Sequence, residues 1–243
     1  MAIVLITGAA KRLGATTAKY FHQQGFTVVV HYGQSQAQAE TLVAELNQLR
    51  DQSAFALAAD LNQVEQIPVL IQRVEEICTH NGLPLKVLVN NASTFFPTPV
   101  NQADLNQWDQ LFNANLKAPF FLVQQCLPLL KKAQGSVVNL VDIHGIRPLQ
   151  NHSLYSSAKA GLIMMTKALA LELAPEIRVN GVAPGAILWP EGGGEDEEIL
   201  ATIPLATTGV PLDIAKAIYY LAVESNYVTG QILPVDGGRT LKQ

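Results

Sequence analysis

The chain has 243 residues, of which 49% are hydrophobic and 15% are charged, and its formal net charge is −4. This composition argues against a disordered chain, and the length predicts one α/β domain with a sizeable core. The acidic balance and the lack of a basic stripe argue against a nucleic-acid surface, and no apolar stretch is as long as a membrane span.

Three further features of the sequence concern the cellular compartment of the protein and its capacity to bind a metal ion. Cys78 and Cys126 lie within helical patterns, which predicts a reducing, cytoplasmic location. The apolar N-terminal run lacks a basic leader and passes directly into a glycine turn, so we do not expect a secretory signal. The five histidines show no metal-ligand spacing, and we expect no metal site.

Short apolar runs alternate with longer amphipathic stretches along the chain. The runs are continuous, which is typical of parallel strands buried on both faces. The alternation predicts an α/β fold, a doubly wound, Rossmann-like parallel sheet, in a single domain covering residues 1–243. In chain order, the predicted elements are strand Ile3–Thr7, helix Leu13–Gln24, strand Thr27–His31, helix Ala37–Arg50, strand Ala54–Ala59, helix Val64–Thr79, strand Lys86–Asn90, helix Leu105–Lys132, strand Ser136–Val141, helix Ser153–Leu173, strand Ile177–Gly181, helix Pro211–Ala222 and strand Gln231–Pro234.

A glycine-containing turn, Thr-Gly-Ala-Ala-Lys-Arg-Leu-Gly over residues 7–14, joins the first predicted strand to the first helix. Backbone N–H groups at a helix N-terminus bind a pyrophosphate, and glycines let the ligand approach closely. The position of this turn predicts a dinucleotide site. Its expected contacts are Gly8, Lys11, Arg12, Leu13 and Gly14.

The end of the second predicted strand favours NADP over NAD. An NAD site usually places an acid there, whereas the sequence His-Tyr-Gly-Gln-Ser over residues 31–35 has no carboxylate. Lys11 and Arg12 offer positive charge to a 2′-phosphate, although both could simply be solvated. The expected contacts at this strand end are His31, Tyr32 and Ser35.

The third and fourth predicted strands also end in candidate cofactor residues. Asp60, followed by Leu61, could accept a hydrogen bond from the adenine amino group or could cap the next helix. Asn91, Ala92 and Ser93 follow the fourth strand, at the carboxyl edge where ligands bind in such sheets.

Tyr155 and Lys159 are spaced to share one face of a predicted helix. A free tyrosine has a pKa of about 10, which is too high for efficient proton exchange at neutral pH. A neighbouring ammonium lowers that pKa and burial raises it, so the cation has to outweigh burial if the phenol is to act as an acid or base. An isolated pair of this kind is more often a core tyrosine beside a snorkelling lysine, so its interpretation depends on the rest of the chain.

The segment Trp189–Glu198 breaks the alternation with a run of glycines followed by acidic residues. This pattern predicts a loop that leads into a short helix with acids at its N-terminus. The loop could be a substrate lid, with Trp189 in the substrate site, or a solvated surface insertion.

Together these motifs resemble the short-chain dehydrogenase/reductase family across essentially the whole chain. The motifs that carry the resemblance, in the family's order, are the glycine turn, Asn-Asn-Ala at 90–92, Asn115, the pair Tyr155 and Lys159, Pro184-Gly185, and Val-Asp-Gly-Gly at 235–238.

The resemblance implies roles for these residues. Tyr155 would be the acid or base, Lys159 would hold the nicotinamide ribose and tune the phenol, and Asn115 would hold a water of a proton relay. Pro184 and Gly185 would contact the cofactor. The family also implies a homotetramer.

Two departures make the chain similar to the pteridine reductases within that family. Most members have a serine 13 residues before the tyrosine, where this chain has Asp142, and a glycine after Asn-Asn-Ala, where it has Ser93. The subgroup shares the glycine turn almost letter for letter. One residue departs from the subgroup, because the pteridine reductases carry an arginine where Gln34 stands, and part of the 2′-phosphate contact is therefore missing.

The subgroup resemblance implies a substrate site beside the cofactor. Phe95 would stack on the pterin, Arg12 and Ser93 would contact both cofactor phosphate and pterin, and Asp142 and Tyr155 would flank the reacting ring. The phenylalanine also offers a flat apolar face on chemical grounds, although ordinary core packing would explain it equally well.

The carboxyl group at position 142 also favours an imine over a ketone substrate. An ionised Asp142 can only accept hydrogen bonds, and it would repel the negative charge that develops when a carbonyl is reduced. An imine nitrogen, in contrast, has to gain a proton as hydride reaches the adjacent carbon.

These arguments predict an NADPH-dependent oxidoreductase that reduces a dihydropterin or dihydrofolate to the tetrahydro form. The enzyme alternative is a short-chain ketone reductase that acts on 3-oxoacyl thioesters, and the non-enzymatic alternative is an NADP-sensing binding protein on the same fold. The expected partner is a small-molecule pterin or folate, with no nucleic acid and no membrane.

Overall fold

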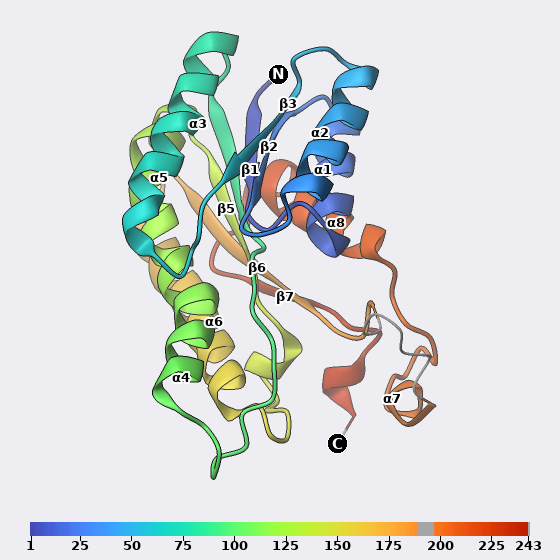
Figure 1. The fold of residues 1–243 in the computed structure, drawn as a ribbon. Coiled ribbons are helices and arrows are strands. Elements are labelled where there is room, and N and C mark those ends of the chain that lie inside the picture. The colour runs from blue at the N-terminus through green and yellow to red at the C-terminus, as the bar shows by residue number, and fades with distance from the viewer. Residues whose placement is uncertain (189–196, 243) are drawn as a thin grey trace.

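The structure, a computed structural model, describes residues 1–188 and 197–242. Within these ranges, the strands form one parallel sheet in the order β3-β2-β1-β4-β5-β6-β7 (Figure 1). This arrangement confirms the predicted doubly wound, single-domain fold. The strands are β1 Ile3–Ile6, β2 Thr27–Tyr32, β3 Ala54–Ala58, β4 Leu85–Asn90, β5 Ser136–Leu140, β6 Arg178–Pro184 and β7 Ile232–Val235.

Helices cover both faces of the sheet. Figure 1 shows α1, α2 and α8 on one side and α3, α4, α5 and α6 on the other. Among the described residues, no helix is long and apolar enough to cross a membrane. The helices are α1 Arg12–Gln23, α2 Gln36–Leu49, α3 Ile67–Asn81, α4 Leu105–Phe112, α5 Ala118–Ala133, α6 Ser153–Leu173, α7 Glu197–Ala201 and α8 Pro211–Tyr219.

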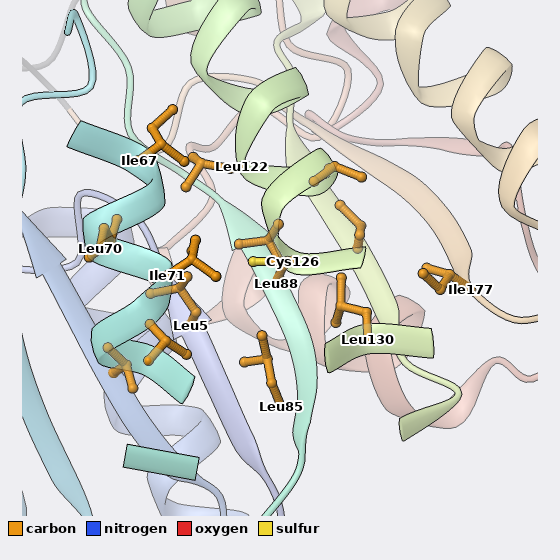
Figure 2. Packing of buried hydrophobic residues seen from close by; sticks show 14 of the residues in the cluster. Leu5, Ile67, Leu70, Ile71, Leu85, Leu88, Leu122, Cys126, Leu130 and Ile177 are labelled. Atoms are coloured by element: carbon orange, nitrogen blue, oxygen red, sulfur yellow. The ribbon is translucent and has the colours of Figure 1, made fainter. Parts of the chain in front are cut away.

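Side chains of the central strands alternate between two cores. In β1, Ile3 and Leu5 pack with α3, α5 and the end of α6, whereas Val4 and Ile6 pack with α1, α2 and α8. All four side chains are fully buried, as expected for a strand with helices on both faces. The first of these cores, which includes Leu88, Leu122 and Cys126, is shown in Figure 2.

The strand order reverses at β1, which pairs with β2 on one side and β4 on the other. In doubly wound sheets, ligands bind beyond the carboxyl ends of the strands at this position. The turn after β1 and the residues after β4 therefore share one edge of the sheet with the ends of β2, β3, β5 and β6.

The bounds of several predicted elements differ from the observed ones, and β6 is one of these elements. β6 extends to Pro184, beyond the predicted end at Gly181, and its last residues pair with β7. Glycine and proline are both disfavoured in strands, so the sequence pattern concealed this extension. Gly181 has a packing reason, because a Cβ atom there would lie 2.7 Å from Cδ1 of Ile232.

The predicted helix Leu105–Lys132 is interrupted by a π-helical turn at Asn113–Lys117, which separates α4 from α5. The short helix α7, with Glu197 and Glu198 in its first turn, confirms the helix expected after the acidic run. Trp189 and the glycines of that loop lie outside the described residues.

Candidate active site

A cavity of about 1020 Å³ lies along the carboxyl ends of the strands. It is large enough for a dinucleotide and a small substrate, because ligand pockets usually measure about 300–1,000 Å³. The structure brings most of the predicted site residues to this one cavity. Those that line it are Gly8, Lys11, Arg12, Leu13, Gly14, His31, Asp60, Leu61, Asn91, Ala92, Ser93, Asp142, Tyr155, Lys159, Pro184 and Gly185.

The glycine turn is bound to the segment that follows β4. Asn91 Nδ2 donates to the carbonyl oxygens of Thr7 and Gly8 at 2.7 and 3.0 Å. Gly8 has φ of +60°, and a Cβ atom there would lie 2.9 Å from Cα of Ala92. A Cβ atom at Gly14 would lie 2.5 Å from the carbonyl oxygen of Gly8. Both glycines are therefore required for this turn, which leaves its backbone open to a phosphate group.

His31 supports the same turn from β2. Its Nδ1 accepts a hydrogen bond from the backbone N–H of Gly8 at 3.1 Å, and its Nε2 bonds to the carbonyl oxygen of Ala59 at 3.1 Å. These partners assign the neutral tautomer with the proton on Nε2. Burial lowers the pKa of His31 to about 4, against the opposing effect of the bond to Ala59. His31 thus lines the cavity with both ring nitrogens already engaged by the protein.

The remaining predicted contacts at the end of β2 are placed differently. Tyr32 and Ser35 do not line the cavity, whereas Gly33 and Gln34 do. Tyr32 packs against the core on the α1 and α2 side, because side chains of a strand alternate between its faces. That alternation could have identified Gly33 as a residue on the cavity side.

Asp60 takes part in a local turn at the end of β3. Its Oδ1 accepts hydrogen bonds from the backbone N–H and from Nδ2 of Asn62, both at 3.0 Å. The side chain therefore closes a local turn. The helix-cap interpretation of Asp60 is wrong, because the N-cap residue of α3 is Gln66. Asp60 and Asn62 both line the cavity.

Tyr155, Asp142 and Lys159 meet at the other end of the cavity. The Tyr155 hydroxyl donates to Oδ2 of Asp142 at 2.7 Å, and Oδ1 of Asp142 accepts from the backbone N–H of His144 at 2.8 Å. Lys159 Nζ donates to the carbonyl oxygen of Leu140 at 2.9 Å and lies 5.7 Å from the centroid of the Tyr155 ring. Tyr155 and Lys159 are almost completely buried.

Burial and the charge of Asp142 dominate the electrostatics of this group. Burial raises the pKa of Tyr155 well above its usual value, Asp142 raises that pKa further, and Ser93 acts in the opposite direction. The condition that the ammonium of Lys159 outweighs burial is therefore not met in this structure, in which the phenol is bonded to a carboxylate. Burial lowers the pKa of Lys159 itself to about 8, against the opposing effect of Asp142.

Asn115 lies in the π-helical turn between α4 and α5, where it is fully buried and does not line the cavity. Its Nδ2 donates to the carbonyl oxygens of Thr94 and Leu111 at 2.8 and 2.9 Å, and its Oδ1 accepts from Ser93 Oγ at 2.7 Å. The bond to Leu111 uses a carbonyl one turn earlier in the helix, which fits the local change in helical pitch.

Phe95 is 55% exposed and does not line the cavity, but its ring lies beside the phenol. Its centroid is 4.8 Å from that of Tyr155 in an edge-on arrangement and 4.7 Å from that of His152 in a parallel stack. His152 was not among the predicted site residues. It is the N-cap residue of α6, three residues before Tyr155, so its spacing could have identified it.

Several other residues that line the cavity were also missed. The polar Asn106 and Gln110 lie one turn apart on α4, and the apolar Ile187 and Leu188 follow β6. Among the described residues, no group of three or more His, Cys, Asp or Glu side chains could hold a metal ion.

Comparison with known proteins assigns this chain to a family. A family model described as short chain dehydrogenase matches residues 2–195. The chain belongs to the short-chain dehydrogenase family. It is therefore a short-chain dehydrogenase in fold and an oxidoreductase by family, and the enzymes of this family use a nicotinamide cofactor, NAD(H) or NADP(H).

Relatives of this short-chain dehydrogenase act on different substrates, as their names state. It is 34% identical over 278 residues to pteridine reductase 1 of Leishmania tarentolae, with 98% of this chain and 96% of the relative covered. It is 36% identical over 245 residues to a 3-oxoacyl-[acyl-carrier-protein] reductase of Thermotoga maritima, with 97% and 96% covered. It is 34% identical over 248 residues to 3beta-hydroxysteroid dehydrogenase 1 of Eggerthella lenta, with 98% and 93% covered. Since these identities are similar, the choice of substrate depends on the residues of the site.

Proposed function

We propose that this short-chain dehydrogenase is an NADPH-dependent pteridine reductase. It transfers hydride to the C=N bond of a dihydropterin or dihydrofolate and yields the tetrahydro form. The observation that carries the proposal is the 2.7 Å hydrogen bond between the phenol of Tyr155 and the carboxyl group of Asp142. This pair places two proton-binding groups side by side, where the wider family has a tyrosine and a serine.

The pair suits a substrate whose nitrogen has to gain a proton. Tyr155 and Asp142 act as one coupled acid, because a proton that leaves either group changes the proton affinity of the other. A carboxylate at this position disfavours ketone reduction, since it repels an alkoxide and offers that alkoxide no donor. The bound cofactor supplies the hydride.

NADPH is the proposed cofactor, and the residues around the turn fit its phosphates. The exposed side chains of Lys11 and Arg12 line the cavity, and the sequence at residues 31–35 contains no carboxylate that would repel a 2′-phosphate. Lys159 holds the nicotinamide ribose in this proposal, and its ammonium group is fixed beside the phenol by the carbonyl oxygen of Leu140.

Phe95 is the proposed stacking face for the pterin ring. His152 stacks on the ring of Phe95, and the rings of Phe95 and Tyr155 meet in a T-shaped arrangement, so a flat substrate that packs on the exposed part of Phe95 would lie next to the proton donor. The side chain is 55% exposed, which leaves part of it available to a ligand.

A ketone reductase that acts on 3-oxoacyl thioesters is the second candidate. The similarity to the Thermotoga maritima reductase supports it, and Asp142 argues against it. Oxidation of NADPH should be measured with dihydrobiopterin, dihydromonapterin, dihydrofolate and an acetoacetyl thioester. We expect turnover of at least one of the first three and little of the thioester, and the reverse order would contradict the proposed function.

A further inference from the structure

A stack of two rings joins the loop after β4 to the start of α6. The ring of Phe95 lies nearly parallel to that of His152, with an interplanar angle of 10° and centroids 4.7 Å apart. The same phenylalanine meets Tyr155 in a T-shaped arrangement, with centroids 4.8 Å apart. His152 is the N-cap residue of α6, three residues before the tyrosine. One exposed ring therefore contacts both the phenol and the residue that begins the helix of the phenol.

Hydrogen bonds of its own turn fix the position of His152. Its backbone N–H donates to the carbonyl oxygen of Leu149 at 3.1 Å, and its carbonyl oxygen accepts from the N–H of Ser156 at 2.9 Å. Nδ1 of the ring lies 2.8 Å from the carbonyl oxygen of Gln150. That oxygen can only accept, so Nδ1 carries a proton and donates it to this bond. The imidazole is thus held by the chain around it and offers a fixed surface to Phe95.

Phe95 lies in a less ordered setting. It belongs to residues 91–99, which form neither helix nor strand, and its side chain is 55% exposed. The backbone of this segment is anchored at Thr98, which is fully buried and whose N–H donates to the carbonyl oxygen of Asn151 at 2.6 Å. This bond joins the two loops but does not select a rotamer for a side chain three residues away. The rotamer of Phe95 is instead held by its ring contacts with His152 and Tyr155.

We propose that His152 is a positioning residue that holds the ring of Phe95 edge-on to Tyr155 and so prepares the surface on which the substrate ring stacks. Without the imidazole, other rotamers of the exposed phenylalanine become accessible, and the substrate has to order that ring when it binds. His152 thus contributes to substrate affinity through Phe95. This inference rests on the proposed function, in which Phe95 stacks on the pterin.

Three substitutions separate the ring of His152 from its hydrogen bond. His152→Ala removes both, His152→Asn keeps an amide that can donate to Gln150, and His152→Phe keeps a flat ring without a donor. KM for the dihydropterin should rise by about 2- to 10-fold in the first two variants, the range that one aromatic pair contributes, and by less than about twofold in His152→Phe. The value of kcat and the NADPH dissociation constant should stay within about twofold of the wild type, because stacking holds the substrate equally before and during hydride transfer.

A double-mutant cycle shows whether His152 acts through Phe95. In a Phe95→Leu background, His152→Ala should change KM by less than about 1.5-fold, because the ring that it positions is absent. An unchanged KM in His152→Ala would overturn the proposal, as would the same increase with and without Phe95. A raised KM in His152→Phe combined with a normal KM in His152→Asn would also overturn it, since the effect would then belong to the turn. A wild-type enzyme that turns over no dihydropterin would contradict the proposed function itself, whereas additivity in the cycle contradicts only the role of His152.

Discussion

The phenol of Tyr155 donates a 2.7 Å hydrogen bond to Oδ2 of Asp142, which lies just past the end of β5 and 13 residues earlier in the chain. The other carboxyl oxygen of Asp142 is fixed by the backbone N–H of His144, so the carboxyl group is oriented by the main chain. A group held in this way faces a reacting atom with little loss of side-chain entropy on binding.

Removal of the phenol tests this relationship first. Tyr155→Phe should lower turnover by about 10²- to 10⁴-fold, the usual contribution of a positioned acid, while NADPH still binds. Steady-state kinetics and a fluorescence titration of NADPH measure the two effects. Tyr227→Phe, which changes a fully exposed tyrosine, is the matched control. Near-full activity of Tyr155→Phe would show that the phenol is not the proton donor.

The preference for NADPH should depend on the positive charge of the glycine turn. Arg12→Ala should weaken NADPH binding by about 10- to 100-fold and NADH binding much less, since a charge-assisted hydrogen bond contributes about 1.5–3 kcal/mol. Dissociation constants for both cofactors give the result, with Arg73→Ala on the exposed face of α3 as the control. Equal losses for NADPH and NADH would contradict the phosphate contact.

Phe95 should contribute to substrate affinity and not to cofactor affinity. Phe95→Leu should raise KM for the dihydropterin by about 3- to 10-fold, because aromatic stacking contributes about 0.5–1.5 kcal/mol beyond area burial. Phe120→Leu changes another exposed phenylalanine, on α5, and should leave KM unaltered. An unchanged KM in Phe95→Leu would remove this residue from the substrate site.

His31 should make the fold sensitive to acid. Burial lowers its pKa to about 4 in the folded chain, against the usual 6.5 of a free histidine, so the unfolded chain binds more protons between these values. Stability should therefore fall as the pH decreases from about 6.5 toward 4, by on the order of 2–3 kcal/mol. Urea denaturation at several pH values in this range gives the free energy of unfolding as a function of pH. This free energy should fall less steeply with decreasing pH in His31→Gln, and as steeply as in the wild type in His80→Gln, which alters an exposed histidine. The same slope in His31→Gln would assign the acid sensitivity to other groups.

Much of the fold was predictable because the buried strands carry continuous apolar runs. β1 ends one residue before its predicted end, and β5 does the same. The break between α4 and α5 was not predictable, because it accompanies contacts of Asn115 with Thr94 and Leu111, and the contact with Thr94 joins segments that only the tertiary structure brings together.

The candidate site, like the fold, was predictable only in part. The glycine turn, Asn91 and the pair Tyr155 and Lys159 could be located from motif and spacing, and they meet in one cavity. The raised pKa of Tyr155 could not be predicted from the sequence. It depends on burial and on the charge of Asp142, and the sequence does not give the distance between that charge and the phenol. The homotetramer implied by the family resemblance stays a prediction.

The substitution Asp142→Ser tests the central claim most directly. The ratio of kcat/KM for a dihydropterin to kcat/KM for an acetoacetyl thioester should be measured with NADPH for the wild type and this variant. We expect the ratio to fall by at least about tenfold in Asp142→Ser, because a serine can donate to an alkoxide but holds no carboxyl proton for a ring nitrogen. An unchanged ratio, with dihydropterin turnover retained, would contradict the assignment of Asp142 as the group that selects a pteridine substrate.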